Sequence, residues 1–232
     1  MSDQNLHPES GVTTAAATGQ QAPGPHAAGP LVPGHLAPLP HVYAFEGLTP
    51  VVDPSAYVHP TAVLIGDVIV GAGCYVGPGA VMRGDFGRIE LRRGANLQDN
   101  CVVHSRGDVD CVMEEDSHIG HGAVIHACRI GRDSLVGMNA VVMDMAHVGD
   151  EAVVAAMSFV KIRDVVAPRT LVAGIPARYV RDLTEANVKG KQNGTQMYKD
   201  LARRSMAGLK PAAALTEVEP DRARNDWTGY SF

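Results

Sequence analysis

Three histidines lie within a short stretch of the chain and are candidates for holding a metal ion together. His104 ends the segment 98–104, and His121 and His126 lie in the segment 118–126. Neutral imidazole binds zinc and similar ions at about 2 Å, so histidine side chains that converge can share one ion. A single histidine in such a segment is more often hydrogen-bonded to neighbouring backbone. Three of them beside a polar insertion favour the metal site over that alternative.

A six-residue repeat must position these histidines. Every sixth residue is a branched aliphatic at Val124, Ile130, Val136, Val142, Val148, Val154, Val160, Val166 and Val172. The same spacing runs upstream at Val58, Leu64, Val70, Val76 and Met82. This period fits short strands separated by tight corners, with each aliphatic side chain pointing into a narrow interior. The sequence therefore predicts a β-helix over about residues 50–176, and the aromatic content of only 5% agrees with a narrow core.

The repeat is interrupted between Met82 and Val124. A shifted set, Ile89, Ala95 and Cys101, keeps the period, and the polar segment 105–110 then breaks it. An insertion in a solenoid must loop outward, and loops on one face often build functional sites. We therefore expect the 105–110 loop beside the histidines.

Composition changes at both ends of the repeat. Residues 1–41 are rich in Ala, Gly and Pro and are predicted to be a disordered tail, because they bury too little apolar surface to offset the entropy of ordering. The β-helix domain is predicted at 42–180 and a helical segment at 181–210. Residues 211–232 are predicted to be an irregular tail.

The helical segment is predicted to contain one or two helices that pack on the β-helix. Thr184 and Thr195 are candidate helix starts, and Gly190 and Gly194 favour a break between two helices. The expected apolar stripe is Met197, Tyr198, Leu201 and Met206.

Charge and hydropathy argue against several classes of partner. The chain has 20 Lys and Arg against 25 Asp and Glu and no dense basic run, so nucleic acid is not an expected partner. No stretch reaches the roughly 18 apolar residues of a membrane-spanning helix, and the first residues lack the pattern of a signal peptide. We therefore expect no membrane association and a cytoplasmic protein. The four cysteines form no CxxC pair and are expected to be reduced and packed.

Several motifs together resemble the γ-class carbonic anhydrase-like hexapeptide-repeat family. They are Arg83-Gly84-Asp85, Gln98-Asp99-Asn100, His104, the segment 121–126 and Gly174-Ile175-Pro176-Ala177. The segments 43–48, 68–73 and 155–161 are similar to the branch that contains the phenylacetate-degradation protein PaaY and the carnitine-operon protein CaiE. The resemblance covers about residues 42–208. It implies an all-β solenoid, a left-handed parallel β-helix of about seven turns with three hexapeptides in each, followed by a C-terminal α-helix.

The resemblance also bears on how the histidines meet. With 18 residues in a turn, His104 and His121 would lie almost one turn apart, so that their imidazoles stack at about the 4.8 Å strand spacing. His121 and His126 are five positions apart and need not converge within one coil. The family implies a homotrimer in which His104 and His126 of one subunit and His121 of its neighbour bind Zn²⁺, with Fe²⁺ or Co²⁺ as alternatives. Three imidazoles leave one position open for water.

Four further residues match positions that the family places near the metal. Arg83 and Asp85 match a pair that organises the trimer and its pocket, although such a pair is also a plausible structural bridge at a corner. Gln98 and Asp99 match polar residues near the metal-bound water, where a carboxylate can fix the tautomer of an imidazole. For Asp99 an Asx-type contact at a corner is the alternative. His118 is expected to pack or to support a ligand histidine.

The leading function that the resemblance implies is a metal-dependent acyl-CoA thioesterase, acting on aryl thioesters of the phenylacetyl type through metal-bound hydroxide. A carbonic anhydrase is one alternative. It is expected to be slow, because Phe86 and Gly107 stand where prototype enzymes carry the glutamates that export protons. Asp108 or Glu114 are candidates for that missing role. The remaining alternatives are a metal-free hexapeptide acyltransferase and an accessory protein of CoA or carnitine metabolism.

Overall fold

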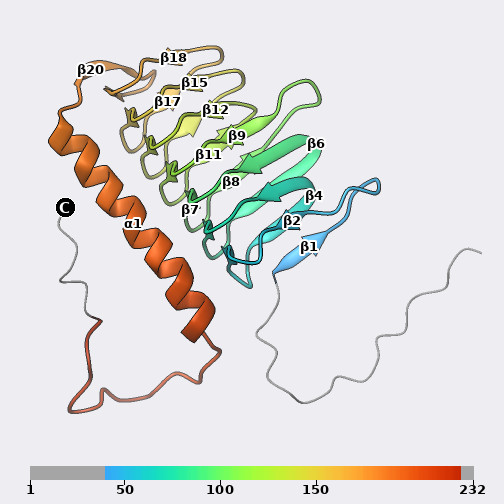
Figure 1. Cartoon of the computed structure of the whole chain (residues 1–232), viewed down its shortest axis with the longest axis vertical. Helices are drawn as coiled ribbons and strands as arrows, with labels where there is room; N and C mark the ends of the chain where they lie inside the picture. Colours follow the sequence, from blue (N-terminus) through green and yellow to red (C-terminus); the bar gives the residue numbers. More distant parts are fainter. Residues whose placement is uncertain (1–39, 226–232) are drawn as a thin grey trace, which may run out of the picture. The chain divides into compact units, whose positions relative to one another are not determined.

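The computed structural model describes residues 40–225, which coil into a parallel β-solenoid of about seven turns with a helix alongside (Figure 1). Its short strands stack on three faces. The first face consists of β1 (His41–Tyr43), the first halves of β4 (Val63–Val70) and β6 (Val81–Leu91), β8 (Val102–His104), β11 (Val124–His126), β14 (Val141–Val142) and β17 (Phe159–Val160). This is the architecture of the left-handed hexapeptide β-helix, as the resemblance implied.

The other two faces follow in chain order within each turn. The second face consists of β2 (Val51–Val52), the second halves of β4 and β6, β9 (Cys111–Met113), β12 (Arg129–Ile130), β15 (His147–Val148) and β18 (Val165–Val166). The third face consists of β3 (Tyr57–Val58), β5 (Tyr75–Val76), β7 (Asn96–Leu97), β10 (His118–Ile119), β13 (Leu135–Val136), β16 (Val153–Val154) and β19 (Thr170–Ala173), and β20 (Arg178–Asp182) pairs antiparallel with β19.

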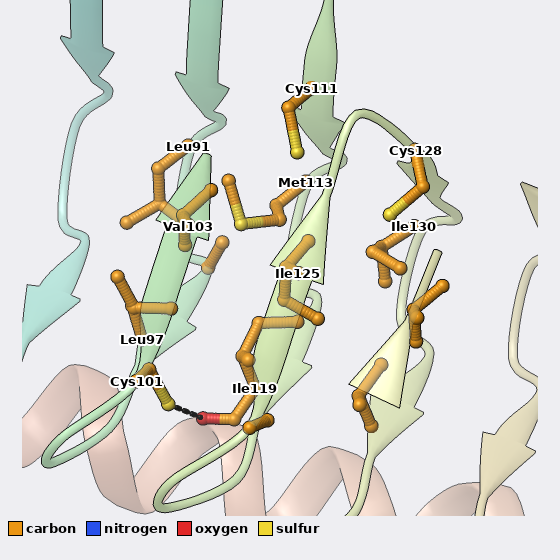
Figure 2. Packing of buried hydrophobic residues seen from close by; sticks show 14 of the residues in the cluster. Leu91, Leu97, Cys101, Val103, Cys111, Met113, Ile119, Ile125, Cys128 and Ile130 are labelled. Carbon is orange, nitrogen blue, oxygen red and sulfur yellow. Dashed lines mark hydrogen bonds between the residues drawn. The ribbon is translucent and has the colours of Figure 1, made fainter. Parts of the chain in front are cut away.

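Aliphatic side chains from successive coils fill the interior, as the six-residue period predicted. Figure 2 shows Leu97, Val103, Ile119 and Ile125 among these side chains, and all of them are fully buried. Such packing stabilises the coils because each buried aliphatic side chain contributes about 1.5–3 kcal/mol of transfer free energy. The four cysteines are free and buried.

The predicted frame is wrong at Val124, which does not point inward. Ile125 is the buried residue of β11, and it pairs with Val142 on the next coil, 17 positions later instead of 18. One corner of this coil is therefore one residue shorter than the repeat requires. Because side chains alternate between the two surfaces of a strand, a slip of one residue turns Val124 outward.

Loops gather at the corner between the first and second faces. Strands β4 and β6 run through this corner, and the loop 105–110 leaves it between β8 and β9, as predicted. An antiparallel bridge between Arg106 and Val109 closes that loop. The expected loop therefore lies at the corner where β8 ends.

Helix α1 (Glu185–Gly208) is one continuous helix, so the predicted break at Gly190 and Gly194 is wrong. Thr184 is its N-cap, as predicted, and forms a capping box with Asn187. The helix contacts β3, β5 and β7 of the third face, so tertiary packing outweighs the roughly 1 kcal/mol that each interior glycine costs.

One side of α1 packs against aromatic side chains of the third face. Tyr198 and Leu201 lie against a cluster of Tyr57, Tyr75 and Ala202, which confirms the middle of the expected stripe. Met206 at its end is 49% exposed.

Among residues 40–225, no helix has the length and apolar sequence that crossing a membrane requires.

Strand β20 continues to Asp182, two residues beyond the predicted boundary, and residues 209–225 contain neither helix nor strand. The predicted tail 1–41 lies outside the described residues except for its last two, and so does the stretch 226–232.

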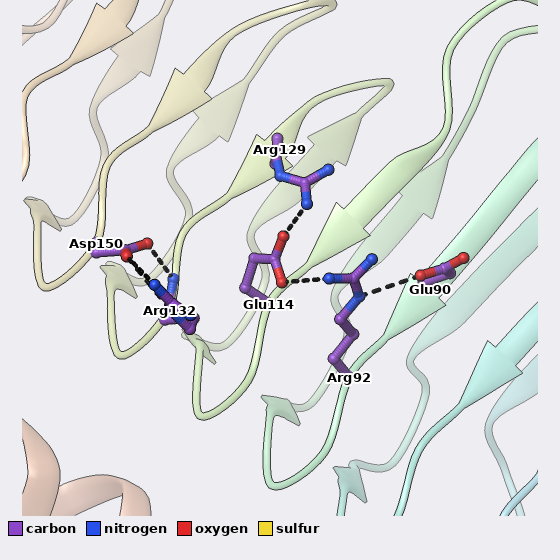
Figure 3. A network of polar contacts seen from close by, with 6 residues as sticks. All are labelled: Glu90, Arg92, Glu114, Arg129, Arg132 and Asp150. Atoms are coloured by element: carbon purple, nitrogen blue, oxygen red, sulfur yellow. Dashed lines mark hydrogen bonds and ion pairs between the residues drawn. The ribbon is translucent and has the colours of Figure 1, made fainter.

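Polar side chains on the second face form a network across neighbouring coils (Figure 3). Buried Glu114 accepts hydrogen bonds from Arg92, at 2.7 Å, and from Arg129. Arg92 also donates to Glu90 at 3.1 Å. The carboxylate of Glu114 thus links three coils of this face.

Candidate functional site

His104 and His126 lie side by side at the corner that carries the loops. They are register partners on β8 and β11, and His104 Nδ1 lies 3.1 Å from His126 Nε2. The expectation that His104 stacks on His121 is therefore wrong. The loop 105–110 adds residues to this coil, so the equivalent position on the next coil is 22 residues away.

Each of these two histidines has a carboxylate on its other ring nitrogen. His104 Nε2 lies 3.1 Å from Asp85 Oδ1, and His126 Nδ1 lies 3.0 Å from Asp144 Oδ2. Arg83 donates to Asp85 at 2.7 Å, so the predicted pair is formed. We call Arg83, Asp85, His104, His126 and Asp144 the two-histidine site.

Burial and charge set the ionisation of this site. Burial lowers the pKa of His104 below its ordinary value, and the nearby Arg83 acts in the same direction. Burial works against ionisation of Asp85, but hydrogen bonds from Arg83 and His104 outweigh it and hold the pKa of this carboxyl below its usual range. The site therefore favours a neutral imidazole beside an ionised carboxylate, which is the state that a metal ligand needs.

Gly84 explains why the Arg83–Asp85 pair can sit on a strand that rounds a corner. A Cβ atom at this position would lie 2.5 Å from the carbonyl oxygen of Asp67. Only glycine tolerates so close an approach of backbone to backbone. Phe86, the residue after Asp85, is 64% exposed, and its ring centroid lies 5.3 Å from that of His104.

His121 lies at the opposite edge of the first face, in the turn between β10 and β11. Its Nδ1 lies 3.2 Å from Asp99 Oδ2, and its Nε2 lies 3.3 Å from the hydroxyl of Tyr198 on α1. The carboxylate of Asp99 thus lies beside an imidazole, that of His121, which the sequence did not identify as its partner. We call Gln98, Asp99, His121 and Tyr198 the one-histidine site.

Gln98 is buried below α1 and organises its neighbours. Its amide donates to Asn96 Oδ1 at 2.9 Å and to His118 Nε2 at 2.6 Å. Because an amide nitrogen can only donate, His118 Nε2 accepts, and the proton of the neutral ring lies on Nδ1. Burial lowers the pKa of His118 to about 3, with Lys191 acting in the same direction. His118 is thus a neutral packing residue beside Gln98, as expected.

The seven predicted site residues therefore fall into two groups within one chain. Arg83, Asp85, His104 and His126 lie at one corner, and Gln98, Asp99 and His121 lie at the other. Among residues 40–225, no three His, Cys, Asp or Glu side chains of a single chain gather in a way that would hold a metal ion. A three-histidine site on this fold needs a second chain.

Asp144 and Tyr198 belong to these sites but were not among the predicted site residues. Asp144 lies 18 positions after His126, one regular turn, so the repeat itself was a signal that could have found it. Tyr198 was expected only to pack, and no spacing rule relates the solenoid to a residue on α1.

Comparisons with known proteins agree with this architecture. A family profile described as bacterial transferase hexapeptide (six repeats) matches residues 49–84. The chain is 59% identical to the carnitine operon protein CaiE of Citrobacter koseri over 182 residues, 78% of this chain and 92% of that protein. Its identity to the CaiE protein of Proteus sp. is 53% over 183 residues, 79% of this chain and 93% of that protein.

Solved structures extend the comparison. A Bacillus cereus protein assigned as an acetyltransferase has a TM-score of 0.71 at 28% identity, with 72% of this chain and 97% of that chain covered. A hexapeptide transferase family protein from Anaplasma phagocytophilum has a TM-score of 0.68 at 36% identity, with 70% and 96% covered. The present chain therefore belongs to the hexapeptide-repeat family and is a homologue of the carnitine operon proteins CaiE, as its repeats, its solenoid and these relatives together show.

Proposed function

We propose that three copies of this chain form a ring-shaped trimer that acts on acyl-CoA thioesters at sites between subunits. The two-histidine site of one subunit would meet the one-histidine site of the next. The observation that carries this proposal is that the two sites lie at opposite edges of the same face. Because the two edges of the face carry different parts of the site, identical copies bring these parts together when they pack head to tail. Packing of this kind can close into a ring.

The outward surface of the first face supports a second copy as the occupant. Register pairs connect an apolar row of Val63, Val81, Val102, Val124, Val141 and Phe159. Val102 is 43% exposed, and α1 contacts the third face instead of this one. A contiguous row of apolar side chains on a surface is typical of a protein interface.

The three histidines fit a shared divalent ion by the chemistry of their surroundings. Each has a carboxylate within 3.2 Å of one ring nitrogen, in the pairs His104–Asp85, His126–Asp144 and His121–Asp99. A carboxylate on one nitrogen orients the ring and leaves the other nitrogen to bind metal. His104, His126 and His121 of the partner subunit would hold the ion, with Zn²⁺, Fe²⁺ or Co²⁺ all suited to three imidazoles.

When bound by these residues, such an ion would supply a water whose pKa is lowered toward neutrality. In thioester hydrolysis, the oxygen of water bonds to the carbonyl carbon and the C–S bond breaks. One proton of the water goes to the thiolate sulfur of CoA and the other to solvent, so that a carboxylate and the free CoA thiol leave. The chain contributes orientation: Asp85 and Asp144 hold the ring nitrogens of His104 and His126. Arg83 keeps Asp85 ionised for this purpose.

Acyl transfer is the second candidate function, and the likeness to an assigned acetyltransferase and to a hexapeptide transferase favours it. In this reaction an imidazole takes the proton of an alcohol or amine, whose oxygen or nitrogen replaces the thiol sulfur on the carbonyl carbon. The carnitine-operon relatives are compatible with either reaction and with an accessory role.

Rapid hydration of carbon dioxide is the weaker alternative, because the structure offers no substitute for the missing glutamates among the residues proposed for that role. Asp108 is paired with Arg106 at 2.6 Å, and Glu114 is held between Arg92 and Arg129 on the second face. Both carboxylates are thus held by arginines.

Mixing two inactive variants tests the shared site. His104→Ala and His121→Ala should each lose bound metal and the release of free thiol from acyl-CoA. If equal amounts of the two chains are refolded together, about a quarter of all interfaces, or one in each mixed trimer, combine intact halves, so both properties should return in part. Adding an amine or alcohol acceptor and identifying the acylated product separates transfer from hydrolysis. Mixtures that stay as metal-free as each variant alone would overturn the shared site.

A further inference from the structure

A cavity of about 650 Å³ lies between helix α1 and the third face, beside the one-histidine site. This volume is in the range of small-ligand pockets, about 300–1,000 Å³. Its walls come from β10, β13, β16 and β19 on one side and from Gly194, Met197 and Tyr198 on the other. Figure 1 shows α1 running along the solenoid from β20 toward the earlier coils. We propose that this cavity binds the extended aliphatic acyl chain of the thioester substrate, a proposal that rests on the acyl-CoA function above.

The length of the cavity follows a ladder of side chains on the outer surface of the third face. His118, Leu135, Val153 and Leu171 are successive register partners, and all four line the cavity. Three strand spacings of about 4.8 Å make this ladder roughly 14 Å long. A trough of this length matches an extended chain better than a single compact ring.

Polar groups line only one end of this trough. Gln98, His118, His121 and Tyr198 belong to the first coils along the ladder or to the part of α1 above them. Beyond them the lining residues are apolar or glycine, including Met138, Ala156 and Leu171. A ligand that matches this pattern has a polar head beside His121 and an apolar body. An acyl thioester has this pattern, with its carbonyl at the head.

A buried polar atom at the same end lacks a partner. His118 Nδ1 is buried and makes no hydrogen bond within the part of the chain that the structure describes. Because Nε2 accepts from Gln98, Nδ1 carries the ring hydrogen and is a donor. A buried donor without an acceptor is unfavourable, and it adds to the polar character of this end of the cavity.

Gly194 offers a way to fill the cavity without disturbing the core. A Cβ atom at Gly194 would lie 3.9 Å from His118 Cε1, an ordinary contact, and longer side chains there would enter the cavity. Gly190 lies one helical turn earlier, and a Cβ atom there meets nothing within 4 Å. Gly194→Leu is therefore the test variant, and Gly190→Leu on the same helix is its matched control.

Binding is measured by calorimetry with thioether analogues of acetyl-, octanoyl- and phenylacetyl-CoA, which cannot be hydrolysed. Each buried methylene is worth about fourfold in affinity, so the octanoyl analogue should bind wild type at least about tenfold tighter than the acetyl analogue. Gly194→Leu should abolish this difference, and Gly190→Leu should keep it. Leu171→Ala, at the far end, should improve binding of chains longer than octanoyl.

Equal affinity for acetyl and octanoyl analogues would overturn the proposal, and so would tighter binding of the phenylacetyl analogue or an unchanged preference in Gly194→Leu. These results do not depend on turnover. If no thiol is released from any acyl-CoA but the length preference is present and lost in Gly194→Leu, the catalytic proposal fails and the acyl cavity stands. If thiol is released but binding shows no preference for chain length, the acyl cavity fails and the catalytic proposal stands.

Discussion

Glu114 shows how a single charged residue is accommodated against a solenoid with an aliphatic interior. Its side chain is 9% exposed, and two arginines from neighbouring coils donate to it. A buried carboxylate without such partners would be costly, because it gives up water without compensation. The same solution recurs at the candidate site, where each histidine faces one carboxylate.

Replacing Glu114 tests whether a buried ion network contributes more to the free energy of unfolding than an exposed ion pair. Glu114→Ala should lower the free energy of unfolding by about 2 kcal/mol, because two arginines lose a shared buried acceptor. The control is Arg132→Ala, which removes the side-chain partner of Asp150 in a pair whose side chains are 66% and 47% exposed. It should cost less than about 1 kcal/mol. Denaturant unfolding at equal protein concentration compares them, and equal losses would contradict this account.

Helix α1 illustrates the same competition at the scale of an element. Its sequence contains Gly190 and Gly194, which weaken a helix, yet it continues for 24 residues. The N-cap at Thr184 and the packing of Tyr198 and Ala202 against the third face supply the stabilisation that local propensity lacks. The continuous helix in turn forms one wall of the proposed acyl cavity.

Two glycine-to-alanine variants should change the free energy of unfolding in opposite directions, because one glycine lies in a helix beside open space and the other lies against the backbone of the next coil. Gly190→Ala should raise the free energy of unfolding by about 0.5–1 kcal/mol, since alanine favours the helix and its Cβ meets open space. Gly137→Ala should lower it by about 1–3 kcal/mol, because its Cβ would lie 2.4 Å from the backbone nitrogen of Ala156 on the next coil. Thermal or denaturant unfolding reads both, and a destabilised Gly190→Ala would show that this position is not open.

At the scale of the whole molecule, the proposed reacting centre exists only where two chains meet. In this arrangement the apolar row of the first face holds two chains together. The contact brings the two-histidine site of one chain to the one-histidine site of the other. Assembly and metal binding should be lost together, because no single chain offers three converging ligands among its described residues.

A charge on the first face should therefore separate the subunits. Val102→Lys should convert trimers to monomers and release the metal, since a lysine in the centre of an apolar interface is not compensated. Val165→Lys is the matched control on the second face, where Val165 is 75% exposed. Light scattering after size exclusion and elemental analysis measure both properties. Val102→Lys trimers with full metal content would contradict the proposed interface.

The sequence by itself determined the solenoid and the chemical types of the candidate residues. The six-residue period is a local property, because each aliphatic side chain must reach the interior of its own coil, so the period could be read without knowing any long-range contact. The insertion at 105–110 and the N-cap at Thr184 were likewise local signals.

Only the tertiary structure decided which of these residues meet. The register between coils depends on the number of residues in every corner, so one insertion paired His104 with His126, and one short corner turned Val124 outward. The continuity of α1 and the contact of Tyr198 with His121 depend on packing between distant segments. Such packing free energies are sums over many contacts that no short segment contains, which is why the two separate halves of the candidate site could not be predicted from spacing alone.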